Sequence, residues 1–244
     1  MSSYLQHRMS VNKQKYLYYL QQQRNIIENS NKKNYNSVDT RKVNKIEKNI
    51  PKDPEDVEII QKKFIDEISL HSPIERLKIL QKQKIIRVFK VEHNYSDQVE
   101  LLENYIVRKK IARSRLGYHL FSNEVKSLLQ LSGNKHFPQI LGYNPQSFEI
   151  YMTYCGQPLT WRNLPDDWKD QVKEISTTLI NRRVNSNDMI VRNTTILNGV
   201  IYIIDFGLNN QFNEDITVVL RNFYYKINEL SFQKFKNLEN LRLT

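Results

Sequence analysis

The segment from Ser186 to Leu208 contains the residues of this sequence that are best suited to chemistry. Asp188 and Asn193 are five residues apart, and Asp205 follows twelve residues after Asn193. Carboxylate and carboxamide oxygens are ligands that Mg²⁺ accepts, and a carboxylate can also orient a hydroxyl group for phosphoryl transfer. These three side chains could therefore form one site, provided that the chain between Asn193 and Asp205 folds back on itself.

A tight β-hairpin is predicted between these residues. The segments TTIL (194–197) and VIYII (200–204) have the character of two short strands, and Asn198-Gly199 joins them. Asn-Gly is the dipeptide best able to adopt the positive φ angles of a two-residue hairpin turn. Such a hairpin would return the chain so that Asp205 emerges beside Asn193 and Asp188.

The spacing of the acidic residues, the Asn-Gly hairpin and the triplet Asp205-Phe206-Gly207 together resemble the catalytic loop and DFG segment of the protein-kinase-like superfamily. The resemblance implies that Asp188 positions or deprotonates the acceptor hydroxyl, while Asn193 and Asp205 hold Mg²⁺. The alternative is an ordinary β-hairpin with acidic residues at its ends. The joint spacing favours the kinase-like interpretation, because it is much harder to obtain by chance than a single DFG triplet.

Length and composition limit the class of protein that this chain can be. The chain has 244 residues, of which 39% are hydrophobic and 11% aromatic, enough for one large domain or two small ones with a real core. A single cysteine, Cys155, excludes an internal disulfide and suits a reducing compartment. No apolar run approaches the roughly 18 residues of a membrane helix, and the first residues lack a secretory signal. We therefore expect a cytoplasmic protein that makes no membrane contact.

The positive charge is concentrated near the beginning of the sequence. The formal net charge is +11, and residues 1–52 contain eleven Lys or Arg against three acidic residues. Residues 1–53 are therefore predicted to be a basic arm or linker. A short helix within 4–27 could pack on the main domain, or the arm could bind nucleic acid or another acidic partner. The many Asn, Lys, Ile and Tyr residues suggest an AT-rich genome, such as that of a large DNA virus. In that case the compartment would be the host cytoplasm or the virion.

Residues 54–155 are predicted to form an N-terminal lobe. A helix begins at Pro54 and runs to about residue 67, and short strands are expected at 68–70, 74–80 and 85–91. In the last strand Lys90 shares a face with Ile86 and Val88, so its charge needs a partner. The segment RVFKV resembles the kinase strand whose lysine grips the α- and β-phosphates of ATP. An edge-strand lysine without a special role is the alternative.

The segment from 120 to 156 resembles the part of a kinase that leads from the αC helix to the hinge. A helix with an apolar face is predicted at 120–131, followed by FPQIL and by a strand that ends in IYMTYCG. The resemblance implies that Glu124 pairs with Lys90, although a helical Glu is more often simply exposed. It also implies that the backbone of Thr153 and Cys155 binds adenine, with Met152 at the back of the pocket. Cys155 has no evident base, so it is not predicted to be a nucleophile.

Several features depart from the family. No glycine-rich loop precedes Lys90, since the sequence there is Leu70-His71-Ser72-Pro73, and Ser186-Asn187 replaces the usual His-Arg pair. Arg192 stands where tyrosine kinases carry an arginine and could neutralise a transferred phosphate. Residues 92–120 are predicted to be a charged helical insert, either a solvated surface or a docking surface. After Gly207 there are 37 residues, which predicts a compact lobe at 156–244 with a buttressing helix near 167–184 and one or two terminal helices.

The sequence as a whole predicts an α+β, two-lobed, protein-kinase-like fold with a short C-terminal lobe. In its compactness it resembles RIO-type and tRNA-modification-complex kinases more than signalling kinases. The predicted function is ATP- and Mg²⁺-dependent phosphoryl transfer to a hydroxyl, as in an atypical serine/threonine protein kinase whose partners are a nucleotide and a protein substrate. Two alternatives remain: a pseudokinase that acts as a structural or interaction scaffold, and a nucleic-acid-associated protein that works through its basic arm.

Overall fold

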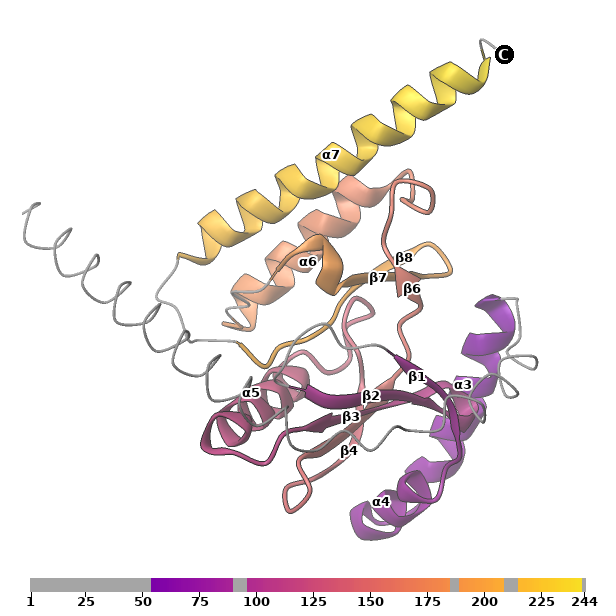
Figure 1. Cartoon of the computed structure of the whole chain (residues 1–244), viewed down its shortest axis with the longest axis vertical. Coiled ribbons are helices and arrows are strands. Elements are labelled where there is room, and N and C mark those ends of the chain that lie inside the picture. Colours follow the sequence, from indigo (N-terminus) through magenta and orange to yellow (C-terminus); the bar gives the residue numbers. More distant parts are fainter. Residues whose placement is uncertain (1–53, 90–95, 185–188, 209–214, 243–244) are drawn as a thin grey trace, which may run out of the picture. The chain divides into compact units, whose positions relative to one another are not determined.

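A computed structural model describes residues 54–89, 96–184, 189–208 and 215–242 (Figure 1). The chain divides into two compact units, Met1–Lys45 and Ile46–Thr244, and all described residues belong to the second. The predicted basic arm at 1–53 lies outside the described residues. The second unit is an α+β structure that contains a five-stranded sheet, a three-stranded sheet and helices, as the sequence predicts. The boundary predicted at residues 155–156 falls between the two sheets.

The larger sheet is antiparallel, with the strand order β1-β2-β3-β5-β4. Its strands are β1 (Ile85–Phe89), β2 (Ser96–Leu102), β3 (Ile106–Ile111), β4 (Ile140–Asn144) and β5 (Glu149–Thr153), and the 3-10 turn η2 (Glu103–Tyr105) joins β2 to β3. The prediction of a helical insert at 92–120 is wrong, because this segment supplies β2, β3 and the start of the next helix. In β3, Val107, Lys109 and Ile111 alternate with Ile106 and Arg108, a period of two that favours a strand.

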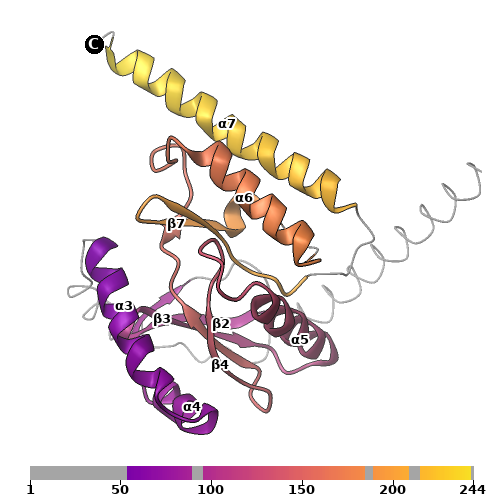
Figure 2. The same ribbon diagram turned by 180° about the vertical axis from the view of Figure 1, so that it is seen from behind.

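Two helices, α3 (Pro54–Ser69) and α4 (Pro73–Gln81), cover one face of the larger sheet (Figures 1 and 2). The helix predicted from Pro54 is confirmed, with acidic residues in its first turn. The strand predicted at 74–80 is wrong, because the segment forms α4. Ser72 caps α4, since its hydroxyl accepts the N–H of Glu75 while the Glu75 carboxylate accepts the N–H of Ser72. Pro73 occupies the first helical position, where a missing N–H costs nothing.

This cap changes the interpretation of residues 70–73. They connect α3 to α4 and do not lie between strands. The connection between β1 and β2 is formed by residues 90–95, which lie outside the described residues. In the sequence this connection reads KVEHNY and contains no glycine. A glycine-rich loop is therefore missing from the sequence at this connection as well.

Helix α5 (Arg115–Gln130) lies on the opposite face of the larger sheet (Figures 1 and 2). The Ser114 hydroxyl accepts the N–H of Gly117 and caps its first turn. The predicted helix at 120–131 is confirmed, and it begins five residues earlier than expected. The ring of Phe121 lies 6.2 Å from that of Tyr143 on β4, which shows that α5 packs directly on the sheet.

The smaller sheet contains the predicted hairpin. Its strands are β6 (Gln157–Pro158), β7 (Thr194–Leu197) and β8 (Val200–Ile203), in the order β6-β7-β8. Asn198 and Gly199 have φ angles of +48° and +74°, so the hairpin turn is confirmed with the positive φ angles that were expected. Gly156 follows the larger sheet with a φ of +88°, and a Cβ atom there would lie 1.9 Å from the carbonyl oxygen of Ile196. The two sheets can therefore meet this closely only because residue 156 is glycine.

Helices α6 (Trp168–Asn181) and α7 (Ile216–Arg242) lie side by side next to the smaller sheet (Figures 1 and 2). The buttressing helix predicted near 167–184 is confirmed as α6, and its buried residues recur at helical spacing. The ring of Trp168 lies 5.3 Å from that of Tyr224 on α7. One terminal helix, α7, follows residue 214. None of the helices in the described parts of the chain combines the length and apolar character needed to cross a bilayer.

A row of polar side chains crosses the sheet face that α3 and α4 cover. Glu100, Arg108 and Tyr151 are cross-strand neighbours on β2, β3 and β5. The Arg108 guanidinium donates to the Glu100 carboxylate, and the Tyr151 hydroxyl donates to Glu149 over 3.2 Å. The side chains of Arg108 and Glu100 are only 12% and 1% exposed. This face therefore holds the nearly inaccessible pair of Arg108 and Glu100, beside the Glu149 carboxylate, which lies 3.9 Å from the Lys110 ammonium.

Candidate functional site

A second group of buried charges lies on the opposite face of β3. The Lys109 ammonium donates to Oε2 of Glu124 over 2.6 Å and to Oδ1 of Asp205 over 2.8 Å. These residues come from β3, α5 and the end of the hairpin, so the cluster joins three separate parts of the chain. Lys109 and Glu124 are buried, whereas the Asp205 side chain is 46% exposed. One lysine thus lies between two carboxylates, one of which reaches the surface.

Electrostatics keep Lys109 charged in this setting. Burial alone would lower the pKa of Lys109, but the carboxylates of Asp205 and Glu124 outweigh it and raise that pKa above its ordinary value. Burial also raises the pKa of Glu124, against the opposing effect of the Lys109 ammonium. Lys109 therefore stays an ammonium between two carboxyl groups, of which Asp205 is the more exposed.

Helix α5 also binds the segment that follows the hairpin. The Glu124 carboxylate accepts the backbone N–H of Phe206, and the Asn123 amide donates to the carbonyl oxygen of Gly207 over 3.2 Å. The Phe206 side chain is fully buried, and its ring lies 6.0 Å from that of Phe137. These contacts fix the backbone on both sides of the Asp205 carboxylate. Asp205 itself has a φ of +66°, a conformation that costs a non-glycine residue about 1–3 kcal/mol and is concentrated at functional sites.

The hairpin places Asn193 beside this segment, as predicted. Asn193 ends the 3-10 turn η3 (Val191–Asn193), and its carbonyl oxygen accepts the N–H of Ile204 over 2.9 Å. Thr194 pairs with Ile203 at the same end of the hairpin. Asn193 and Asp205 therefore start from neighbouring backbone positions. Asn193 is buried, and the neighbouring Arg192 is exposed.

Two of the predicted site residues, Lys90 and Asp188, lie outside the described residues. The partner of Glu124 was expected to be Lys90, and the structure gives Glu124 the ammonium of Lys109 instead. The reason is the strand order: β3 lies between β2 and β5 and next to α5, so a lysine on β3 faces Glu124. The sequence signal that selected Lys90 applies equally to Lys109, which shares a strand face with Val107 and Ile111. The prediction of a helical insert at 92–120 gives Lys109 no such strand face.

The chain between the two sheets presents two backbone groups in one direction. The Tyr154 N–H donates to the carbonyl oxygen of Tyr105 over 3.1 Å, and the Tyr154 carbonyl accepts from Gln61 on α3 over 3.3 Å. In a trans peptide the C=O and N–H point in opposite directions. The Thr153 C=O and the Cys155 N–H therefore both point away from Tyr105 and Gln61. No backbone hydrogen bond among the described residues uses the Cys155 N–H.

Side chains around this connection are packed into the core. Met152 and Cys155 are buried, and the Thr153 hydroxyl accepts the N–H of Gln139 over 2.9 Å. Burial raises the pKa of the Cys155 thiol to about 12, which keeps it a neutral thiol at physiological pH. This agrees with the prediction that Cys155 is a packing residue, since only the thiolate is a good nucleophile.

His136 is a buried polar residue that the sequence analysis did not single out. Its ring Nδ1 lies 2.8 Å from the carbonyl oxygen of Ile201, and its own carbonyl accepts the N–H of Ile203 over 3.0 Å. These contacts tie the loop between α5 and β4 to β8. His136 thus has a structural role in holding the hairpin against the larger sheet. No sequence signal marks it, because its contacts are distant in the chain: the carbonyl of Ile201 is 65 residues away, and Oε2 of Glu174, 3.2 Å from its Nε2, is on α6.

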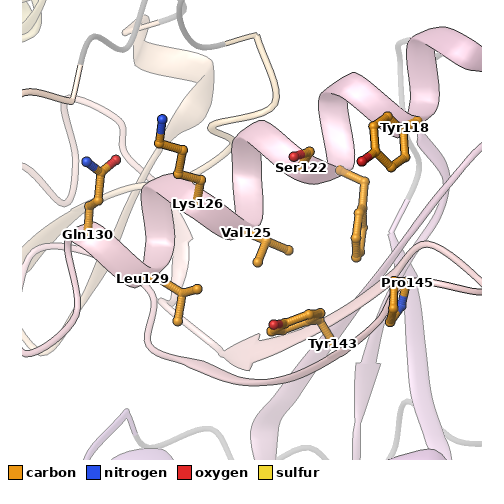
Figure 3. A pocket seen from close by; sticks show the side chains of 9 residues that line it. Tyr118, Ser122, Val125, Lys126, Leu129, Gln130, Tyr143 and Pro145 are labelled. Carbon is orange, nitrogen blue, oxygen red and sulfur yellow. The ribbon is translucent and has the colours of Figure 1, made fainter.

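A cavity of about 530 Å³ lies along α5, away from the ion cluster (Figure 3). It lies between α5 and the end of β4 and contains none of Lys109, Glu124 or Asp205. Its walls are largely apolar, and its lining residues are Tyr118, Phe121, Ser122, Val125, Lys126, Leu129, Gln130, Tyr143 and Pro145. Lys126 is the only charged residue among them and the lining contains no carboxylate, so the ion cluster is the better candidate site. Within the described residues, no three or more His, Cys, Asp or Glu side chains gather in a way that could hold a metal ion.

Comparison with known proteins adds no family to this description. No protein-family model matches the chain, and no curated protein is significantly similar to it.

Proposed function

We propose that this chain is an atypical, minimal member of the protein-kinase-like superfamily, which transfers the γ-phosphoryl group of ATP to a serine or threonine hydroxyl of a protein. The observation that carries the proposal is the cluster of Lys109, Glu124 and Asp205. Kinases of this superfamily use a strand lysine held by a helix glutamate, together with a metal-binding aspartate after a hairpin. On this proposal the larger sheet with α5 is the N-terminal lobe, and the smaller sheet with α6 and α7 is the C-terminal lobe.

Each residue then has a role that its surroundings allow. Lys109, kept protonated by its two carboxylates, would bind the α- and β-phosphates, and Glu124 would hold it in place. Asp188 would orient the acceptor hydroxyl, as the resemblance implies. Arg192, exposed next to Asn193, would neutralise part of the charge on the transferred phosphoryl group.

The residues present fit a magnesium ion. Asp205 offers a carboxylate that reaches the surface, and Asn193 starts from a neighbouring backbone position. Mg²⁺ commonly binds one or two carboxylates together with waters and substrate phosphates, so it does not need a closed cage of side chains. When bound, the ion would neutralise the negative charge that develops on the phosphates.

The connection between the sheets fits adenine. The Thr153 C=O is an acceptor and the Cys155 N–H is a donor, and they face the same way two residues apart. Adenine carries an amino donor next to a ring-nitrogen acceptor, so the two patterns are complementary. Met152 would lie behind the base, in the buried core on β5. This arrangement supports ATP as the phosphoryl donor.

The proposal is tested first by nucleotide binding. A ligand that binds only the folded state stabilises it by RT ln(1 + [L]/Kd), about 2.7 kcal/mol at one hundred times Kd. We expect ATP with Mg²⁺ to raise the apparent melting temperature of the full chain, and Asp205→Asn to abolish the Mg²⁺-dependent part of that rise. Asp166→Asn is the matched control, because Asp166 is an exposed carboxylate that pairs with Lys234 on the surface. Absence of any Mg²⁺-dependent rise at millimolar ATP would refute the proposed function.

Phosphoryl transfer is tested with γ-labelled ATP, using the chain itself and casein as acceptors. We expect label on protein hydroxyls, and loss of at least 99% of the rate in Asp188→Asn with nucleotide binding retained. Binding of ATP and Mg²⁺ without transfer to either acceptor would instead favour a nucleotide-binding scaffold, the pseudokinase alternative.

A further inference from the structure

Gln61 of α3 is a buried polar residue that contacts the connection between the two sheets from the side away from the Thr153 C=O and the Cys155 N–H. It is 8% exposed, and its amide nitrogen donates to the carbonyl oxygen of Tyr105 over 2.8 Å and to that of Tyr154 over 3.3 Å. The two acceptors belong to η2 and to the residue after β5, 44 and 93 positions further along the chain. One side chain therefore joins a helix, a turn and the inter-sheet connection.

The backbone that Gln61 holds is conformationally strained. Asn104 and Tyr105 both have positive φ angles, +59° and +56°, although neither is glycine. A non-glycine residue in this region costs free energy and persists only where its surroundings over-determine it. Here the Tyr105 carbonyl accepts two hydrogen bonds, from Gln61 and from the N–H of Tyr154. The packing of Tyr105 against Val57 and Leu101 adds a buried apolar contact between α3 and the sheet.

We infer that Gln61 is a positioning residue for adenine, an inference that rests on the proposed function. By holding the Tyr154 carbonyl, Gln61 fixes the rotation of the peptide between Tyr154 and Cys155. The N–H of that peptide must then point the other way, toward the side where the Thr153 C=O also points. Gln61 does not touch the nucleotide. It acts by keeping the Cys155 N–H in the orientation that binds the adenine ring nitrogen. The peptide then does not have to become ordered each time a nucleotide binds.

The experiment measures base discrimination, which a merely structural role would not change. Inosine triphosphate has the phosphates of ATP, but its ring carries a carbonyl and an N–H where adenine has an amino group and a bare nitrogen. For the full chain with Mg²⁺, we expect calorimetry to give a Kd for ATP about tenfold lower than for inosine triphosphate, because a mismatched pair leaves polar groups unsatisfied. Gln61→Met removes both donors at similar volume. It should weaken ATP binding and reduce the ratio to about threefold or less.

Gln171→Met is the matched control. Gln171 is also a buried glutamine whose amide binds backbone groups, the carbonyl of Gly199 and the N–H of Ile201, but it lies on α6 next to the hairpin turn. This variant should lose stability and keep the ATP-to-inosine-triphosphate ratio of the natural chain. The buried thiol of Cys155 provides a folding check, because it should stay unreactive toward iodoacetamide in both variants.

The possible outcomes distinguish a failure of this inference from a failure of the proposed function. An unchanged ratio in a folded Gln61→Met protein, or an equal weakening of both nucleotides, would overturn the role of Gln61 and leave the proposed function intact. If the natural chain binds neither nucleotide, the proposed function fails and this inference fails with it. Should Gln61→Met not fold, Gln61→Leu removes both donors without introducing an ionisable group, and hydrogen exchange of the natural chain is a second measurement. The Cys155 amide should be protected by ATP and not by inosine triphosphate, and the opposite result would also overturn the inference.

Discussion

Arg108 and Lys109 are neighbours on β3, yet their side chains lie in two charge clusters on opposite faces of the sheet. The two clusters differ in their exposure to solvent. On the face covered by α3 and α4, Arg108 meets Glu100, and both are nearly inaccessible to solvent. On the face covered by α5, Lys109 meets two carboxylates, and the Asp205 side chain is 46% exposed. The first cluster is closed to solvent, whereas the second is open at Asp205.

The proposed function assigns the first cluster to folding and the second to binding. In a closed ion pair each charged group has lost its water and is compensated by its partner. Removing one partner therefore leaves an uncompensated buried charge. An open cluster lets water or an ion reach one of its charged groups, and the proposed function places Mg²⁺ at that group. The strained backbone at Asp205 points the same way, because strain of this kind is retained where function requires it.

The largest effect on stability is therefore expected in the closed cluster. Glu100→Gln would leave the buried Arg108 guanidinium without its carboxylate, and we expect the free energy of unfolding to fall by about 3–5 kcal/mol. Urea denaturation followed by circular dichroism measures this change. Nucleotide binding at a temperature where the variant is folded should stay close to that of the natural chain.

Asp205→Asn is the counterpart in the open cluster. Because the Asp205 side chain is half exposed and Lys109 keeps Glu124, we expect the free energy of unfolding to change by no more than about 1 kcal/mol. The Mg²⁺-dependent rise with ATP should be lost. Equal losses of stability in Glu100→Gln and Asp205→Asn would show that the two clusters contribute equally to folding, against this interpretation.

A pH experiment tests whether water reaches the sheet face that α3 and α4 cover. Burial raises the pKa of Tyr151 to about 12, against the opposing effect of Arg108, from an ordinary value of 10.0. Between pH 10 and 12 the unfolded chain loses the Tyr151 proton while the folded chain keeps it, so stability is fully present below pH 10 and falls as the pH rises toward 12. Tyr151→Phe lacks this group. The natural chain should lose roughly 2 kcal/mol more than Tyr151→Phe between pH 9 and pH 12.

Urea unfolding of both proteins at the two pH values gives the measurement. The other tyrosines and lysines titrate in both proteins, so their contribution cancels in the difference. Parallel loss of stability in the two proteins would mean that Tyr151 ionises as easily in the folded chain as in the unfolded one. The closed face would then be accessible to water.

The sequence predicts the open cluster better in its local parts than in its long-range parts. The hairpin with Asn198-Gly199, the helix that carries Glu124 and the helix that begins at Pro54 all have local signals, namely a turn dipeptide, an apolar period and a helix start. For Lys109 the only local signal is its alternation with Val107 and Ile111, and its contact with Glu124 depends on the pairing of β3 with two other strands. In the sequence alone, Lys109 sits among charged neighbours and looks like part of a solvated surface.

The role of Gln61 is even harder to predict from the sequence than that of Lys109. Nothing in the sequence distinguishes it from other glutamines, and its partners lie 44 and 93 residues away. Tertiary contacts of this kind depend on the relative placement of α3, η2 and β5, which local patterns do not determine. The wrong strand prediction at 74–80 has a related cause, since four apolar residues in seven fit a buried strand as well as a helix, and the Ser72 cap decides between them.

The smallest effect is expected at Lys110, next to Lys109 on the same strand. Its ammonium lies 3.9 Å from Glu149, and its side chain is 31% exposed, so the pair contributes only about 0–1 kcal/mol. Lys110→Met should therefore keep both the stability of the natural chain and the Mg²⁺-dependent rise with ATP. Lys109→Met changes the same residue type one position earlier and should abolish that rise, because the phosphates lose their cation. Differential scanning fluorimetry with ATP and Mg²⁺ compares the two variants directly. If Lys110→Met abolished the rise and Lys109→Met did not, the nucleotide would have to bind on the closed face, and the assignment of the open cluster as the site of chemistry would be wrong.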